Sequence, residues 1–270
     1  MSESLDCLPA SVREIAAAVA DAVRGDPRML GVTIGGSAVV GAMDEFSDAD
    51  FVIVCGDDAH ADVLAEAPDF AARIGPLLAA FTGEHVGEPR LLIALYGPPL
   101  LHVDLKFVAR SDLASRVEDG LLVWERDGEV TATRSATAPA WPEPDLQWIE
   151  DRFWIWIHYG AAKLGRGELF ECLEVLTAFR TAVFGPLLAV AHGQRPQGVR
   201  RVERYAPGAV PELTATIGDH TSAGCAAALR ASIALYRRLR EQLAEPSLVE
   251  RREAEAAVIE YLDELAQQIG

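Results

Sequence analysis

The sequence GGSAVVGAMDEFSDADFVIV, residues 35–54, decides the fold of this chain. The apolar run at residues 29–34 comes just before it and predicts a strand that ends at the Gly-Gly-Ser sequence, with a short helix to follow. Glycine at this point lets the main chain approach a ligand closely. The hydroxyl of Ser37 and the free N–H groups at the start of a helix suit a phosphate group.

Two aspartates follow Ser37 after ten intervening residues and lead into a second predicted strand, residues 51–55. Asp48 and Asp50 are two positions apart, so on a strand their side chains point to the same face. Adjacent carboxylates repel each other, and such a pair is costly unless a cation lies between them. Magnesium fits this role because it prefers oxygen ligands and leaves room for substrate phosphates.

A third aspartate lies in LHVDLKFV, residues 101–108, where apolar and polar residues alternate. The alternation predicts a strand that carries His102, Asp104 and Lys106 on its polar face. We expect Asp104 to share metal with the first two aspartates. Lys106 either neutralises phosphate or pairs with an acidic side chain.

The order Gly-Ser, ten residues, Asp-x-Asp and then a strand aspartate resembles the polymerase-β-like nucleotidyltransferase superfamily over residues 29–108. The resemblance implies a small mixed sheet, two magnesium ions and transfer of a nucleotidyl group from a nucleoside triphosphate. It implies that the triphosphate is held by Gly36 and Ser37 and that the metals are bound by Asp48, Asp50 and Asp104. It also places Asp104 beside the attacking oxygen as a general base, with His102 as the competing candidate. Aspartates that only cap turns are the structural alternative.

The rest of the first half predicts a helix at residues 11–24, a helical stretch at 59–82 interrupted at Pro76, and strands at 91–96 and 121–125. Residues 131–145 hold three prolines and many small polar residues, which is typical of a linker. Beyond them the pattern predicts only helices, at residues 145–165, 168–191, 222–243 and 247–268. The predicted fold class is α+β: an N-terminal nucleotidyltransferase domain, residues 1–138, with a mixed sheet and flanking helices, followed by an all-α helical bundle domain, residues 139–270.

A helical second domain of this size resembles that of the aminoglycoside and lincosamide adenylyltransferases, which implies a role in antibiotic resistance. Arg152, Trp156, Tyr159 and Lys163 fall on one helical stripe. By the resemblance, Lys163 contacts the outer phosphates of the nucleotide; the alternative is a solvated lysine whose stem covers Tyr159. Trp154 and Trp156 either pack in the core or line an acceptor pocket.

The formal net charge of -17 and the pI of about 4.7 disfavour nucleic acid and anionic membranes as partners and favour cations. The basic segment 195–204 either binds nucleotide phosphates or forms a solvated helix face. Cys7, Cys55, Cys172 and Cys225 are far apart, which predicts free or buried thiols in a reducing compartment. The N-terminal sequence lacks a signal-peptide pattern and no apolar stretch approaches the ~20 residues that span a bilayer, so we expect a cytoplasmic protein without a membrane partner.

These observations predict an adenylyltransferase that uses ATP and two magnesium ions. AMP would pass to a hydroxyl of a small molecule, aminoglycoside- or lincosamide-like, with release of pyrophosphate. A cationic acceptor would suit the acidic protein. The alternatives are the same chemistry on a protein or RNA acceptor, as in toxin-neutralising modules, and a nucleotide-binding protein without turnover. The sequence does not specify the acceptor or the nucleobase.

Overall fold

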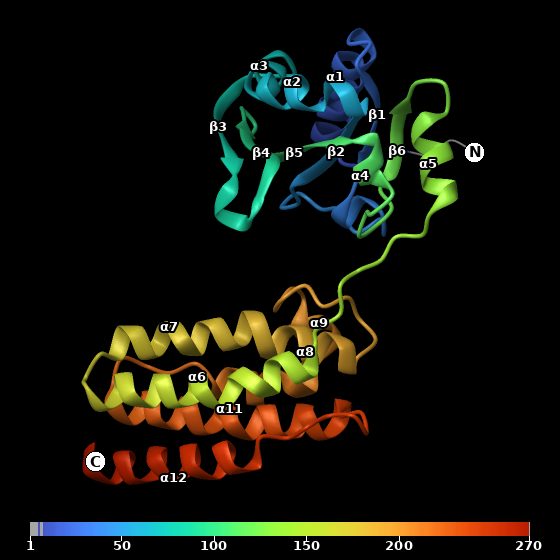
Figure 1. Ribbon diagram of the computed structural model, residues 1–270. Helices are drawn as coiled ribbons and strands as arrows, with labels where there is room; N and C mark the ends of the chain where they lie inside the picture. Colours follow the sequence, from blue (N-terminus) through green and yellow to red (C-terminus); the bar gives the residue numbers. More distant parts are fainter. Residues whose placement is uncertain (1–4, 6–7, 270) are drawn as a thin grey trace. The chain divides into compact units, whose positions relative to one another are not determined.

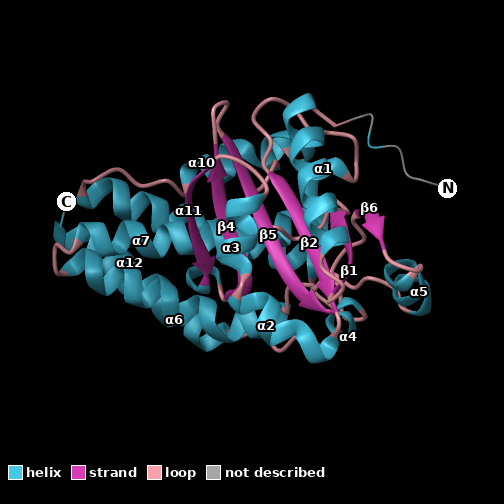
Figure 2. Ribbon diagram, turned by 90° about the horizontal axis from the view of Figure 1, so that it is seen from above, coloured by secondary structure: helices cyan, strands magenta, loops and turns pink. Residues whose placement is uncertain are grey.

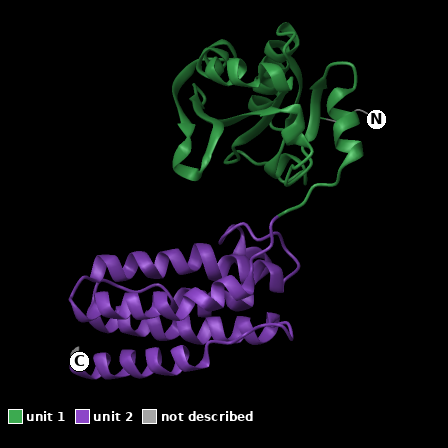
Figure 3. Ribbon diagram, viewed as in Figure 1, with its two compact units in different colours: residues 1–141 green, residues 142–270 purple. Residues whose placement is uncertain are grey.

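The structure is a computed structural model that describes residue 5 and residues 8–269. The chain forms two compact units, residues 1–141 and residues 142–270, shown in different colours in Figure 3. The sequence analysis placed this boundary between residues 138 and 139. The first unit contains a sheet with flanking helices and the second unit is helical, so the predicted α+β fold class is confirmed.

The first unit is built on a six-stranded mixed sheet whose strand order is β3-β4-β5-β2-β1-β6 (Figures 1 and 2). Strands β2 and β5 are parallel, and all the other neighbouring pairs are antiparallel. The six strands are β1 Met29–Ile34, β2 Ala49–Cys55, β3 Leu77–Gly83, β4 Glu88–Tyr96, β5 Leu101–Ala109 and β6 Leu121–Glu125. Five of these were expected from the sequence; β3 was not.

One face of the sheet is covered by three helices, α1 Ala10–Gly25, α2 His60–Ala65 and α3 Ala67–Arg73 (Figure 1). Helix α1 forms because apolar residues recur on one stripe, and that stripe is buried against alternate residues of the strands. On β2 and β5 the residues that face these helices are Phe51, Ile53, Val103, Leu105 and Phe107. The residues between them must therefore point to the opposite face.

The opposite face is covered only in part. Two short helices, α4 Arg110–Leu113 and α5 Glu129–Ala136, contribute Leu113 and Val130 to a small apolar cluster with Val54 and Val108. Val54 and Val108 lie near the carboxyl ends of β2 and β5, because those strands end at residues 55 and 109. The amino ends of the same two strands carry polar residues on this face, and there the candidate site lies.

The prediction of helix over residues 77–82 was wrong. These residues form β3, an edge strand that pairs antiparallel with β4. Leucine and alanine favour helices, but Pro76 cannot continue one, and pairing with β4 overrides the local preference. The predicted linker is also shorter than expected, because α5 takes up residues as far as Ala136 with Val130 fully buried.

The second unit packs four long helical segments alongside one another (Figure 1). These are α6 Leu146–Gly165, the segment Leu169–Ala191, α11 Ser222–Leu243 and α12 Arg252–Ile269. The segment Leu169–Ala191 consists of α7 Leu169–Phe179, a π-helical turn Arg180–Phe184 and α8 Gly185–Ala191. Two short helices, α9 Val202–Tyr205 and α10 Val210–Ala215, complete the unit. The four predicted helical segments are confirmed, except that the last begins at Arg252 and not at residue 247; α9 and α10 were not predicted.

The segment Leu169–Ala191 corrects the expectation that no stretch is long and apolar enough to cross a membrane. Its 23 residues reach that threshold by length and composition, with a mean hydropathy of 1.5. Leu176, Phe179, Phe184 and Leu188 on this segment are buried in the apolar core of the second unit. Core packing therefore accounts for its composition. The described cysteines Cys55, Cys172 and Cys225 are free thiols buried in the apolar cores, and Cys7 lies outside the described residues.

Glu150, a buried carboxylate of α6, connects this helix to α11 and to the main chain just before α12. Glu150 is fully buried and accepts hydrogen bonds from Tyr236 Oη at 2.6 Å, Trp154 Nε1 at 3.1 Å and the Arg251 main-chain N at 2.8 Å. Arg240 forms an ion pair with it at 3.1 Å. Burial by itself would raise the pKa of Glu150, but these hydrogen bonds and the arginine outweigh it and hold the pKa below the ordinary value.

Candidate functional site

Two of the three predicted aspartates are paired by the sheet itself. Asp50 on β2 and Asp104 on β5 are register partners, and neighbouring residues on adjacent strands point to the same face. Asp48 comes just before β2, two positions from Asp50. All three side chains are half-buried. The strand alternation predicted from the sequence therefore holds, and it brings Asp50 and Asp104 together from distant parts of the chain.

Asp104 lies in a negative environment with one polar partner on its own strand. His102 Nε2 is 2.9 Å from Asp104 Oδ1. Burial raises the pKa of Asp104, the His102 ring lowers it through its charge and its hydrogen bond, and the negative charge of Asp48 raises it again. The net direction is upward. Asp48 is thus close enough to Asp104 for their charges to interact, which places the third carboxylate at the same end of the face.

The Gly-Gly-Ser turn packs directly against Asp50. Gly35 N donates a hydrogen bond to the main-chain oxygen of Asp50 at 2.8 Å. Gly36 adopts a left-handed conformation with φ +61, and a Cβ at this position would overlap Asp50 Oδ2. Glycine is required here for two reasons, the backbone conformation and the closeness of the carboxylate. The turn therefore sets where the Asp50 carboxylate lies.

Ser37 follows in a short 3-10 helix, Gly36–Ala38, that continues from the turn. The side chain is buried, with 4% exposure, and its Oγ has no hydrogen-bond partner among the described residues. Buried polar atoms are nearly always paired, so an unpaired hydroxyl beside a cluster of carboxylates is unusual. An oxygen of a bound ligand would satisfy it.

Glu118 is a residue of this site that the sequence analysis missed. Its Oε1 accepts a hydrogen bond from Gly36 N at 3.3 Å. The residue lies in the irregular segment between α4 and β6, and 82 positions separate it from Gly36. No periodicity or motif marks such a residue, because only the folded sheet brings that segment beside the turn.

The carboxylates do not form a complete metal site by themselves. Within residue 5 and residues 8–269, no group of three or more histidine, cysteine, aspartate or glutamate side chains is arranged so that it could hold an ion. Magnesium usually takes only one or two carboxylates and completes its shell with water and substrate phosphates. The pair Asp50 and Asp104, with Asp48 beside it, fits that kind of site, and the metal roles of the three aspartates remain predictions.

Lys106, on the same face of β5, pairs with an acidic side chain. Its Nζ lies 2.7 Å from Glu88 Oε2, and Arg90 contacts the other oxygen of Glu88 at 2.7 Å. The two cations lower the pKa of Glu88 to about 2, although burial acts in the opposite direction. Of the two roles considered for Lys106, the structure shows the ion pair.

Lys163, the predicted phosphate ligand, lies near the carboxyl end of α6 in the second unit. Its Nζ contacts Glu168 at 2.8 Å and Glu171 at 2.9 Å, and it lies 5.0 Å from the ring centroid of Tyr159. The two glutamates raise the pKa of Lys163. The charge of Lys163 is thus compensated by two glutamates, and its ammonium group lies near the ring of Tyr159. A role in phosphate binding stays a prediction.

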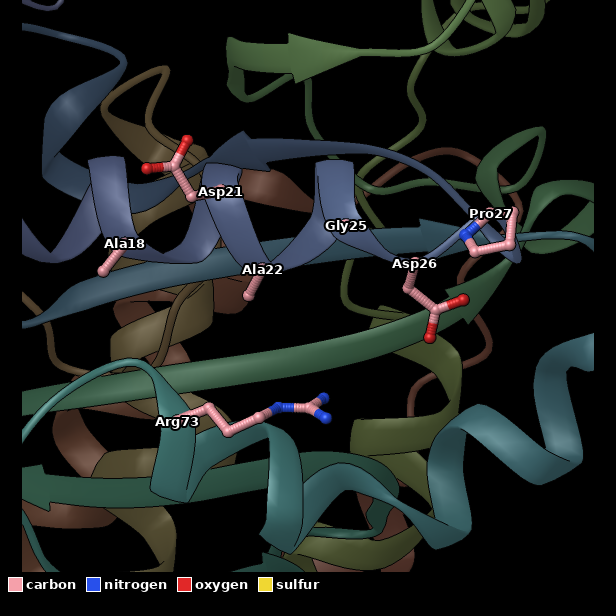
Figure 4. A pocket seen from close by; sticks show the side chains of 7 residues that line it. All are labelled: Ala18, Asp21, Ala22, Gly25, Asp26, Pro27 and Arg73. Atoms are coloured by element: carbon pink, nitrogen blue, oxygen red, sulfur yellow. The ribbon is translucent and has the colours of Figure 1, made fainter.

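Two hollows lie away from the aspartates. The larger, about 660 Å³, lies between α1 and α3 and is lined by residues that include Asp21, Asp26 and Arg73 (Figure 4). It is on the helix-covered side of the sheet, whereas Asp50 and Asp104 point to the other side, and Asp26 is already paired with Arg28 at 2.7 Å. This hollow therefore does not belong to the candidate site.

The smaller hollow, about 210 Å³, is in the second unit at the start of α6, and Trp148 lies in its wall with four prolines. Trp154, one of the two tryptophans considered for an acceptor pocket, is buried in the core, and Trp156 packs against that core.

The prediction of a helix face at residues 195–204 was wrong, because most of this segment forms turns before α9.

No protein-family model matches the chain, and no curated protein matches it. Several solved structures are similar to it, among them the following two. An aminoglycoside 6-adenyltransferase from Bacillus subtilis is 15% identical, with 96% of this chain and 99% of that chain covered and a TM-score of 0.39. A nucleotidyltransferase-like protein from Exiguobacterium sibiricum is 12% identical, with 96% of this chain and 75% of that chain covered and a TM-score of 0.32. At such identities and scores, the functional argument rests on the residues of the site.

Proposed function

We propose that this chain is a nucleotidyltransferase that moves AMP from ATP to a hydroxyl of a small molecule and releases pyrophosphate. The observation that carries the proposal is the pairing of Asp50 with Asp104 on adjacent parallel strands, directly beside the Gly35-Gly36-Ser37 turn. Carboxylates for a metal and main-chain N–H groups for phosphate are thereby brought to one place. Phosphoryl-type transfer needs little more than positioning and neutralisation of charge.

The turn would hold the phosphates. Its main-chain N–H groups are suited to phosphate oxygens, and the Ser37 hydroxyl is buried without a protein partner. An unsatisfied buried polar group costs about 1–3 kcal/mol, which a phosphate oxygen would recover on binding. Gly36 contributes by leaving space, because a side chain there would displace the Asp50 carboxylate.

Asp48, Asp50 and Asp104 would hold magnesium, which supplies positive charge next to the transferring phosphate when it is bound. Without a cation, the neighbouring carboxylates repel each other; burial raises the pKa of Asp104 most, and the negative charge of Asp48 adds to this effect. A divalent cation that binds these three carboxylates in the folded state stabilises the folded protein, and removal of the cation takes this stabilisation away.

Asp104 is the proposed general base for the acceptor hydroxyl. The strand register places Asp104 beside Asp50, and an ionised carboxylate at this place can accept the proton of the attacking hydroxyl. His102 contacts only one of its two oxygens in the contacts described, Oδ1 at 2.9 Å, and would orient the carboxylate. We therefore assign the base to Asp104 and a positioning role to His102.

A small hydroxylated acceptor that carries positive charge suits a chain with a formal net charge of -17. The same charge disfavours RNA, whose phosphates would be repelled. Aminoglycosides, which carry amino and hydroxyl groups together, are the first compounds to test, and lincosamides follow.

The test is a pyrophosphate-release screen with ATP, magnesium and individual aminoglycosides, lincosamides and other hydroxylated compounds. We expect release with at least one acceptor, loss of release in Asp50→Asn, and normal release in Asp62→Asn, whose side chain is exposed on α2. Equal release by Asp50→Asn and the wild type would contradict the site. If ATP binds but no small acceptor supports release, protein and RNA acceptors are tested next, and failure of those leaves a nucleotide-binding protein.

A further inference from the structure

We propose that Glu118 competes with the nucleotide for the Gly35-Gly36-Ser37 turn and thereby weakens the affinity of the protein for ATP. This inference rests on the proposed function, because it concerns the place assigned above to the phosphates. Glu118 has no part in the predicted nucleotidyltransferase pattern, and its role follows from where the folded chain puts its carboxylate.

The carboxylate of Glu118 lies against both glycines of the turn. Its Oε1 accepts the hydrogen bond from Gly36 N at 3.3 Å. A Cβ built on Gly35 would lie 3.3 Å from the same oxygen and 3.8 Å from the main-chain oxygen of Asp50. A carboxylate therefore receives the N–H group that suits phosphate, in the same way that an anion would.

The segment that carries Glu118 is held on both sides. On one side, Arg116 donates to the main-chain oxygens of Arg134 at 3.1 Å and Thr137 at 2.8 Å. On the other side, Gly120 lies so close to Thr33 on β1 that a Cβ there would be 2.8 Å from its Oγ1. The main chain on both sides of Glu118 is thus fixed by its neighbours, and this places the carboxylate against the turn.

Two anions cannot share this position. A single N–H group has one hydrogen to donate, and Glu118 adds a negative charge beside the Asp50 carboxylate, which already packs against Gly36. The nucleotide must displace Glu118 before a phosphate oxygen reaches Gly36 N. The bond of 3.3 Å is slightly longer than the ~2.7–3.2 Å range of N–H···O hydrogen bonds, so Glu118 holds Gly36 N weakly and a phosphate oxygen can replace it there.

If Glu118 were a ligand, its removal would change the nucleotide affinity in the opposite direction. If Glu118 held magnesium or oriented the nucleotide, removing its carboxylate would weaken nucleotide binding. Competition instead predicts that its removal strengthens binding. The direction of the change in affinity therefore distinguishes the two roles in one measurement.

The experiment is isothermal titration calorimetry of the full chain with α,β-methylene-ATP and magnesium, which reads binding without turnover. The variants are Glu118→Gln, which keeps the shape and removes the charge, and Glu118→Ala, which removes both. Glu14→Gln, exposed on α1 on the other side of the sheet, is the control for loss of one negative charge. We expect about three- to tenfold tighter binding in both Glu118 variants, since the net contribution of one ordinary hydrogen bond is of this size, and no change in the control.

Unchanged or weaker binding in Glu118→Gln overturns the competition, whatever the alanine variant does. Equal tightening in Glu14→Gln also overturns it, because the effect would then be one of net charge. If the wild type and both Glu118 variants fail to bind the nucleotide, the proposed function fails together with this inference. If the wild type binds and the variants bind no better, only this inference fails.

Discussion

Replacement of Gly36 by alanine tests whether the turn sets the position of Asp50. Gly36 has φ +61, and a Cβ there would overlap Asp50 Oδ2. Gly41 provides a matched control, because it has φ +62 and a Cβ there would meet nothing within 4 Å. The two substitutions impose the same backbone strain, and only one of them disturbs the carboxylate.

The two variants should differ in both thermal stability and turnover. A non-glycine residue in the left-handed region costs about 1–2 kcal/mol, and this cost applies to both variants. Gly36→Ala should lose a further ~1–3 kcal/mol from overpacking against Asp50. At about 2–4 °C per kcal/mol for a chain of this size, its unfolding midpoint should lie at least about 2 °C below that of Gly41→Ala. A misplacement of about 1 Å in a catalytic group reduces turnover by about 100-fold, and we expect that loss in Gly36→Ala alone.

The assay pairs thermal unfolding, followed by circular dichroism, with pyrophosphate release at saturating ATP and acceptor. The reasoning is refuted if Gly36→Ala and Gly41→Ala have the same unfolding midpoint and turn over within a few fold of each other. Loss of stability without loss of turnover in Gly36→Ala would show that the Asp50 carboxylate is not needed where the turn places it.

Three further predictions concern single side chains. Asp104→Asn should bind ATP and lose transfer by about 10²–10⁴-fold, while His102→Ala keeps most of its turnover; the reverse result in a kcat comparison would make His102 the base. Lys163→Ala should weaken binding of ATP more than of ADP in calorimetry, and equal affinities would leave this lysine with its two glutamate partners alone. Glu150→Gln should lower the free energy of unfolding at pH 7 by about 3 kcal/mol. The folded state lowers the pKa of Glu150, so the difference in unfolding free energy between wild type and Glu150→Gln is fully present above the unfolded pKa of about 4.3. It should shrink as the pH falls through the pKa of the folded state. A difference, measured by urea denaturation, that stays constant from pH 7 to pH 3 would contradict this prediction.

Local patterns predicted the features of the fold that depend on short-range alternation. The strands around Asp50 and Asp104 follow from apolar residues at every second position, and the long helices from apolar stripes. Strand β3 was missed because its residues favour helices locally and only its pairing with β4 makes it a strand. Helix α5 was missed in part because its small polar residues are held by the burial of one side chain, Val130.

Some features of the candidate site could likewise be predicted from local patterns, and others depend on the folded sheet. A shared face for Asp48 and Asp50 was predicted from their spacing and stays a prediction, because β2 begins at Ala49 and Asp48 precedes it. That Asp104 is the register partner of Asp50 depends on which strands are neighbours, and the sequence predicted only that Asp104 shares metal with the first two aspartates. Glu118 could not be predicted, because its contact with Gly36 spans 82 positions and involves an irregular segment. The ion pairs of Lys163 with residues of α7 and the turn before it were equally beyond local reasoning.

The most direct test of the central claim, that Asp50 and its neighbours form a magnesium–nucleotide site beside the Gly-Gly-Ser turn, is a calorimetric titration with α,β-methylene-ATP in the presence and absence of magnesium. The wild type should bind the nucleotide at least about tenfold more tightly with magnesium than without it, because repulsion between the carboxylates and the phosphates is then relieved. Asp50→Asn should lose this magnesium dependence while its unfolding midpoint stays near that of the wild type. Binding that is independent of magnesium, or a magnesium dependence that Asp50→Asn retains in full, would contradict the account.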